Sequence, residues 1–154
     1  MSVYKDGNIR IYSAIDIADF IVRKCDDLGF GISNLKLQKI LYFVQAEFLV
    51  SLKKACFEEE IEAWDFGPVV PEVYRKYRVY GGANIPVCFK HNTNELIEKE
   101  DGELIEEIIQ ECNKYSAVDL VGITHSQKPW KDAYKKGENR IITKESIKSY
   151  FEGE

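Results

Sequence analysis

Apolar residues recur at helical spacing near the start of the chain. Between Ser13 and Gly29 they lie three or four residues apart, which is the period of one buried helix face. These positions are Ala14, Ala18, Ile21, Cys25 and Leu28. Ser13 and Asp16 form a candidate capping box, and Gly29 and Gly31 favour a helix end. The pattern predicts an amphipathic helix between these signals.

The next segment, from about residue 34 to 52, is apolar around most of its circumference. Either Ser33 or Asn34 can cap it. One face is formed by Leu37, Ile40, Leu41, Val44 and Phe48, and that face is widened by Tyr42, Phe43 and Leu49. A helix that is apolar on most sides is normally buried. We therefore expect it at the centre of the fold.

Residues 57–66 are compatible with a β-strand and lead into a Gly-Pro turn. Because the proline of Gly67-Pro68 disfavours helical backbone at the residue before it, the chain is expected to turn there. Pro71 suits the first turn of a helix that Gly81-Gly82 would end. The expected buried side of that helix is Val70, Val73, Tyr74 and Tyr77.

Residues 83–99 are compatible with a β-hairpin. Ile85 to Phe89 and Glu95 to Ile97 would be its strands, on either side of the polar stretch 91–94. Pro86 would confine the first strand to a sheet edge. This segment is therefore a candidate for the β element of the fold.

Periodicity and caps predict three or four helices in the last third. One amphipathic helix contains Leu104, Ile105, Ile108, Ile109 and Cys112. Later helix starts are indicated by the capping pair Ser116 and Asp119, by Pro129, and by Thr143 before Ile147, Tyr150 and Phe151, with Gly137 as a stop between the last two.

These elements predict a mainly α fold, a compact bundle of six or seven helices around a central helix (about 34–52), with a minor β element or hairpin. No internal repeat and no linker rich in Pro, Gly or Ser interrupts the 154 residues. We therefore expect a single domain over 1–154.

Composition and charge narrow the class of protein. The hydrophobic fraction of 45% and the charged fraction of 31% are typical of a globular chain. No basic leader and no apolar run long enough for a membrane span is present, so a cytoplasmic protein without membrane association is expected. The formal charge of −5 argues against a general affinity for nucleic acid. Acidic residues crowd into 95–111 and basic ones into 128–148, most simply as solvated helix faces.

Candidate catalytic and metal-binding chemistry is sparse. Cys25, Cys56, Cys88 and Cys112 lie far apart and are expected to be reduced structural thiols. Cys88 and His91 would supply half of a four-ligand metal site, and the glycines match no nucleotide-binding fingerprint. His125 lies in no recognisable nucleophile context. We therefore expect no enzymatic activity, no cofactor and no bound metal.

Two tryptophan-containing segments stand out, at residues 62–70 and 123–130. Tryptophan is a common anchor of protein interfaces, but it is also highly buried on average. On physical grounds each segment is more readily a core-forming corner than an exposed site, and both interpretations stay open.

At residues 35–45, 62–74 and 124–130 the chain resembles the Panacea antitoxin domain family, also described as SocA-like or phage-associated. The residues that carry this resemblance are Leu37, Lys39, Tyr42, Trp64, Gly67, Pro68, Val69, Tyr74, Thr124, His125, Pro129 and Trp130. The resemblance implies a compact helical domain that binds and neutralises a protein toxin encoded by an adjacent gene. It also implies a variant role, in which the domain delivers its bound toxin to a protease and its unfoldase.

Members of this family often carry an extra domain, whereas only about a dozen residues precede the first predicted helix here. A separate DNA-binding domain is therefore not expected, and a regulator that binds DNA through its basic C-terminal helices remains a further hypothesis. Asp65, Tyr74 and Arg75 are our candidates for contact with the partner.

Overall fold

We analysed a computed structural model of the chain, which describes residues 11–88 and 93–153. Its α-helices are α1 (Ala14–Asp27), α2 (Asn34–Glu47), α3 (Pro71–Tyr77), α4 (Lys99–Cys112), α5 (Ala117–His125), α6 (Lys128–Ala133) and α7 (Lys144–Phe151). Its strands are β1 (Ile61–Trp64), β2 (Gly67–Val69) and β3 (Ile141–Ile142). Short 3-10 turns follow at Arg78–Tyr80 and Thr93–Glu95. The predicted mainly α class with a minor β element is confirmed.

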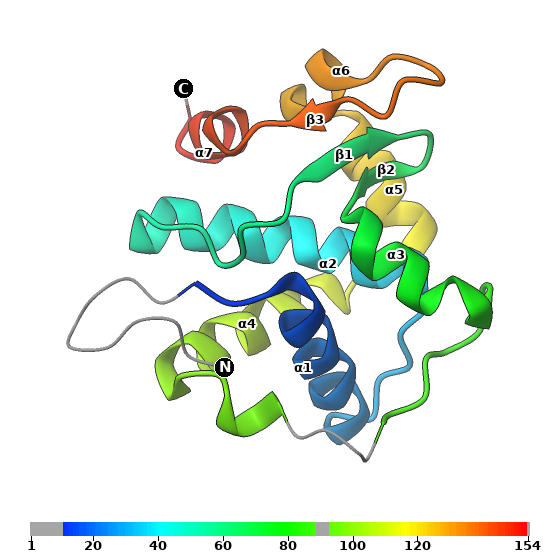
Figure 1. Cartoon of the computed structure of the whole chain (residues 1–154), viewed down its shortest axis with the longest axis vertical. Helices are drawn as coiled ribbons and strands as arrows, with labels where there is room; N and C mark the ends of the chain where they lie inside the picture. The colour runs from blue at the N-terminus through cyan, green and yellow to red at the C-terminus, as the bar shows by residue number, and fades with distance from the viewer. Residues whose placement is uncertain (1–10, 89–92, 154) are drawn as a thin grey trace.

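Helix α2 lies at the centre, as its apolar circumference predicted. It crosses the middle of Figure 1, with α1 and α4 on one side and the sheet, α6 and α7 on the other. Leu37, Leu41, Tyr42 and Val44 are completely buried. A π-helical turn, Phe48–Leu52, extends α2 to the predicted end. Every other layer of the fold is therefore organised by its contact with α2.

The helix starts follow the predicted caps. The hydroxyl oxygens of Ser13, Ser33 and Thr143 each accept a hydrogen bond from a backbone N–H in the first turn of their helix. Ser116 and Asp119 form a complete, reciprocal capping box at α5. These local signals were readable in the sequence because a cap involves residues only three apart.

The β element is a three-stranded antiparallel sheet in the order β2-β1-β3. Trp64 pairs with Gly67 and Glu62 with Val69, which makes β1 and β2 a tight hairpin. Strand β3 comes from far along the chain, pairs Ile142 with Ile61, and was not anticipated from the sequence.

The hairpin expected within residues 83–99 is wrong. Ile85 to Cys88 have no regular structure and Thr93–Glu95 form a 3-10 turn, while residues 89–92, including His91, lie outside the described residues. The N–H of Ile85 donates to the carbonyl of Ile32, in the loop before α2, at 2.9 Å. Ile85 and Ile97 are both buried in the core. The apolar residues here anchor a loop to the bundle, and burial alone cannot distinguish that role from a strand.

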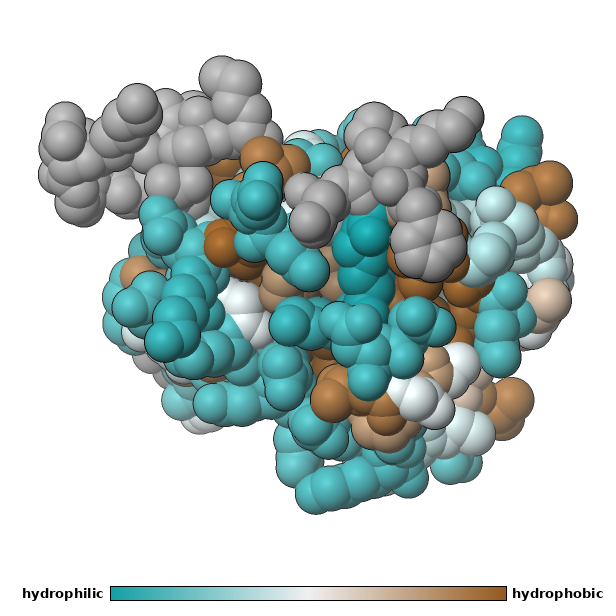
Figure 2. All heavy atoms as spheres, turned by 90° about the horizontal axis from the view of Figure 1, so that it is seen from below, coloured by the Kyte–Doolittle hydropathy of each residue, from teal (hydrophilic) through white to brown (hydrophobic). Residues whose placement is uncertain are grey.

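The acidic stretch of α4 behaves as a solvated helix face. Glu103, Glu107 and Glu111 are exposed, whereas Ile105 and Ile109 on the other side are buried. Figure 2, which views the molecule from below, shows hydrophilic side chains over most of that face, with apolar patches between them.

Candidate functional site

The turn between β1 and β2 requires a glycine. Gly67 has φ +109°, a conformation that side chains with a Cβ rarely adopt. A Cβ at this position would lie 2.6 Å from Cε of Lys39 and 2.9 Å from Oγ1 of Thr124. The backbone of β2 therefore approaches α2 and α5 as closely as packing allows. We call residues 64–68 the hairpin corner.

Lys39 holds the hairpin corner from α2. Its side chain is completely buried, and its Nζ donates a hydrogen bond to the carbonyl of Pro68 at 3.0 Å. Burial lowers the pKa of Lys39 to about 7, because the charged amine loses its hydration. A buried amine with a carbonyl as its hydrogen-bond partner is costly, so its presence indicates a specific role at this position.

Helices α5 and α6 hold the other end of the corner. His125 donates from Nε2 to the carbonyl of Asp65, and Trp130 donates from Nε1 to the carbonyl of Trp64, both at 2.9 Å. The rings of His125 and Trp130 stack with centroids 4.0 Å apart, and Trp130 stacks in turn on Tyr134 at 4.5 Å. The hydroxyl of Tyr134 donates to the carboxylate of Asp65 at 2.5 Å. This hydrogen bond raises the pKa of the Tyr134 hydroxyl.

A chain of buried amides links α2 to β2 and α3. The Gln38 side chain accepts from the N–H of Val70 and donates to Asn34, both at 2.9 Å. Asn34 in turn donates to the carbonyl of Tyr74 at 3.2 Å. Sequence reasoning missed Asn34, Gln38 and Tyr134 as site residues. For Asn34 and Gln38 the available signal was the presence of amides within an otherwise apolar helix, because buried polar groups need partners.

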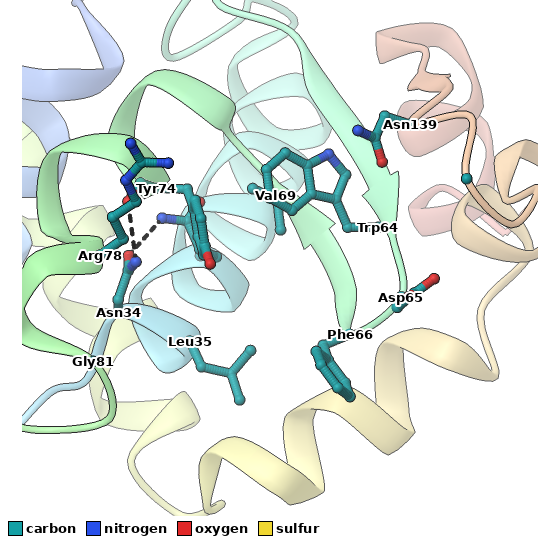
Figure 3. A pocket seen from close by; sticks show the side chains of 12 residues that line it. Asn34, Leu35, Trp64, Asp65, Phe66, Val69, Tyr74, Arg78, Gly81 and Asn139 are labelled. Carbon is teal, nitrogen blue, oxygen red and sulfur yellow. Dashed lines mark hydrogen bonds between the residues drawn. The ribbon is translucent and has the colours of Figure 1, made fainter.

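A groove opens beside the hairpin corner, between β1–β2, α3 and the first turn of α2 (Figure 3). Its volume is about 490 Å³. Its apolar side chains are Leu35, Trp64, Phe66, Val69 and Tyr74, and its polar ones are Asn34, Gln38, Asp65, Arg78 and Asn139. Trp64 and Tyr74 meet edge to face with ring centroids 5.0 Å apart. Phe66, at the tip of the hairpin, is 67% exposed.

The structure separates the residues singled out by sequence into three groups. Lys39, Thr124, His125 and Trp130 meet Trp64, Gly67 and Pro68 at the hairpin corner. Val69, Tyr74 and Asp65 line the groove. Trp64 belongs to both groups, because it is part of the hairpin corner and also lines the groove. Leu37, Tyr42 and Pro129 are buried in the interior, where the Tyr42 hydroxyl donates to Gln127 at 2.8 Å. Arg75 is exposed on α3 and does not line the groove, whereas Arg78 does.

Residues that could carry other chemistry are dispersed. Within residues 11–88 and 93–153, no three His, Cys, Asp or Glu side chains are grouped so that they could hold a metal ion. Cys25, Cys56 and Cys112 are buried, and burial raises the pKa of each thiol. Among the same residues, no helix combines the length and the apolar character needed to cross a lipid bilayer.

In fold class the protein is mainly helical, with a small antiparallel sheet held between helices. Within that class it belongs to the antitoxin SocA-like, Panacea domain family, whose model matches residues 37–131. The chain is 34% identical over 131 residues to antitoxin SocA of Caulobacter vibrioides (strain NA1000 / CB15N), a match that covers 74% of this chain and 66% of that protein. The chain thus spans just under two thirds of that relative's length. No solved structure matches it significantly.

The resemblance expected from the sequence motifs is therefore confirmed. The region matched by the family model begins at Leu37 and ends at Lys131. It contains the whole hairpin corner and its holding residues Lys39, His125 and Trp130, and it stops before Tyr134 and Asn139.

Proposed function

We propose that this protein is an antitoxin that neutralises a protein toxin by binding it directly, without enzymatic activity of its own. Membership of the SocA-like, Panacea domain family supports an antitoxin role. We take the toxin to be the product of an adjacent gene and the complex to form in the cytoplasm. Neutralisation by occlusion needs only a stable complex that covers the working surface of the toxin.

The observation that carries the proposal is a rigid corner that keeps an apolar ring in solvent. Phe66 is 67% exposed, although the carbonyls of Trp64 and Asp65 before it accept hydrogen bonds from α6 and α5, and that of Pro68 after it accepts one from α2. Exposed aromatic side chains beside a groove are typical of protein-binding surfaces. Because the corner is already ordered, little conformational entropy is lost when a partner binds it.

The polar side chains at the corner support a binding role rather than catalysis. His125 and Tyr134 are engaged with Asp65, and Lys39 is buried beneath the turn. A general base must reach a proton of the substrate, whereas His125 and Lys39 hold backbone carbonyls and Tyr134 holds the Asp65 carboxylate.

Co-expression with the adjacent reading frame tests the proposal. We expect that frame to arrest growth when expressed alone and to be harmless when this protein is present, and we expect the two products to purify together. An adjacent frame that is harmless alone, or a toxicity that persists in the presence of this protein, would contradict the proposal.

The lifetime of the bound toxin separates occlusion from delivery to a protease. After translation is stopped, a toxin that is only occluded should persist in the complex for as long as the antitoxin does. Rapid loss of the toxin that depends on this protein would instead support the adaptor role implied by the family resemblance.

A further inference from the structure

We infer that the groove beside the hairpin corner receives one short segment of the toxin, in which an apolar side chain lies next to a carboxylate. The inference rests on the proposed function and adds to it the binding surface and the chemistry of the bound segment. The apolar side chain would pack among Trp64, Phe66 and Tyr74, and the carboxylate would pair with Arg78.

The apolar part of the groove is suited to a side chain of the partner. Leu35, Val69 and the Trp64–Tyr74 pair form its walls, and Phe66 stands at its hairpin end (Figure 3). A volume of about 490 Å³ falls in the range of pockets that hold drug-sized ligands. It therefore fits a few residues of a chain rather than a whole helix, and Phe66 would lose most of its exposed surface on binding.

The free edge of β2 is turned toward α2 and is closed to an added strand. Pro68 has no N–H, and its carbonyl is occupied by Lys39. The N–H of Val70, the next outward-facing donor, is occupied by Gln38. A partner strand would find no ladder of free groups here, so recognition must come from side chains.

The charges of the groove select a carboxylate. Asp65 and Arg78 are the two charged side chains that line it, and they lie on opposite sides (Figure 3). The Asp65 carboxylate accepts from Tyr134. Arg78 is exposed on the other side, and among the described residues no carboxylate pairs with it. An unpaired guanidinium beside an apolar wall is a favourable site for a carboxylate, because the pair would be partly shielded from water.

Affinity measurements with matched variants test this inference. The probe is the purified product of the adjacent gene, titrated calorimetrically into the full chain. Phe66→Ser should weaken binding about tenfold, and Arg78→Glu about a hundredfold, since it replaces attraction by repulsion. Val118→Ser and Arg75→Glu are the controls: both residues are exposed and neither lines the groove. Arg78→Ala is a milder second variant should Arg78→Glu fold poorly.

The outcomes distinguish the inference from the function on which it rests. If the wild-type protein does not bind the probe, the proposed function fails and the inference fails with it. If the wild-type protein binds and neutralises it but Phe66→Ser and Arg78→Glu bind equally well, or Arg75→Glu loses as much affinity as Arg78→Glu, the groove is overturned and the function stands. Finally, Asp→Lys and Glu→Lys substitutions along the toxin should include one that restores binding to Arg78→Glu. Failure of all of them would overturn the paired carboxylate.

Discussion

The hairpin corner has an inner and an outer side that differ in how they use polar groups. On the inner side the carbonyls of Trp64, Asp65 and Pro68 each accept a hydrogen bond from a side chain of α6, α5 or α2. On the outer side lies the groove, with Phe66 in solvent and Arg78 without an ion-pair partner among the described residues.

The residues that carry the family resemblance can be compared with the two sides of the corner. Lys39, His125 and Trp130, which carry much of the resemblance, all act on the inner side. Trp64, Val69 and Tyr74 also carry the resemblance but line the groove, whereas Arg78, on the same groove, lies outside the segments that carry it. The motif therefore covers the scaffold and part of the groove, and we expect the choice of partner to depend on groove side chains outside the motif, such as Arg78. Substitutions on the two sides should accordingly separate stability from binding.

The largest effect on stability is expected at Gly67, where β2 lies closest to α2 and α5. Gly67→Ala should lower the free energy of unfolding by about 3 kcal/mol, because it adds both backbone strain and overlap with Lys39 and Thr124. Urea denaturation measures this. The matched control is Gly122→Ala on α5, where nothing lies within 4 Å and alanine favours the helix. Similar losses in both variants would mean that the close approach at Gly67 contributes little.

A smaller effect is expected from a single hydrogen bond of the inner side. Trp130→Phe keeps an aromatic ring in the stack but removes the donor to the Trp64 carbonyl, which should cost about 1–2 kcal/mol of unfolding free energy. Tyr134→Phe is the control for a hydrogen bond at the surface, since its hydroxyl meets a carboxylate that water can solvate, and should cost less than about 0.5 kcal/mol. Equal losses would mean that the Trp64 carbonyl depends no more on its donor than the surface carboxylate of Asp65 does.

Lys39 makes the unfolding free energy of the protein depend on pH. From pH 7 to 8 the unfolded chain keeps this amine protonated, as its ordinary pKa is 10.5, while the folded state, with a pKa of about 7, releases the proton. The unfolded state then binds more protons, so stability rises with pH, by about 1 kcal/mol over this interval. Lys39→Met should remove that rise. Urea denaturation at each pH gives the unfolding free energy of both proteins, and the difference between them is compared from pH 7 to pH 8.

The difference in unfolding free energy between the two proteins separates the effect of Lys39 from that of the buried thiols. Burial raises the pKa values of Cys25, Cys56 and Cys112, so their ionisation in the unfolded chain lowers stability as the pH approaches 9. That change is common to the wild-type protein and the variant and cancels between them. Parallel pH profiles for the two proteins would show that the folded state leaves the pKa of Lys39 unchanged.

The smallest effect on stability is expected at the outer side. Phe66→Ser removes a ring that is mostly in solvent and should change the unfolding free energy by less than about 0.5 kcal/mol, while it weakens toxin binding. The same denaturation assay measures this. A loss above about 1 kcal/mol would instead make Phe66 part of the scaffold and contradict the separation of the two sides.

Much of the fold could be read from the chain because its signals are local. The starts of α1, α2, α5 and α7 follow from a hydroxyl and an N–H three residues apart. The central position of α2 follows from its apolar circumference. The sheet could not be predicted in full, since β3 pairs with β1 across a long stretch of chain. The apolar residues of 83–99 are as compatible with a hairpin as those of the real strands.

The sequence by itself determined most of the helices, the family and the residues that carry the family resemblance, because caps, periodicity and motifs are properties of short segments. Only the tertiary structure decided what those residues do. It placed Lys39 under Pro68 and Trp130 against Trp64, and it put Arg78 rather than Arg75 on the groove. These pairings depend on how α2, α3 and α6 pack against one hairpin, and packing between distant segments leaves no periodic pattern in the chain.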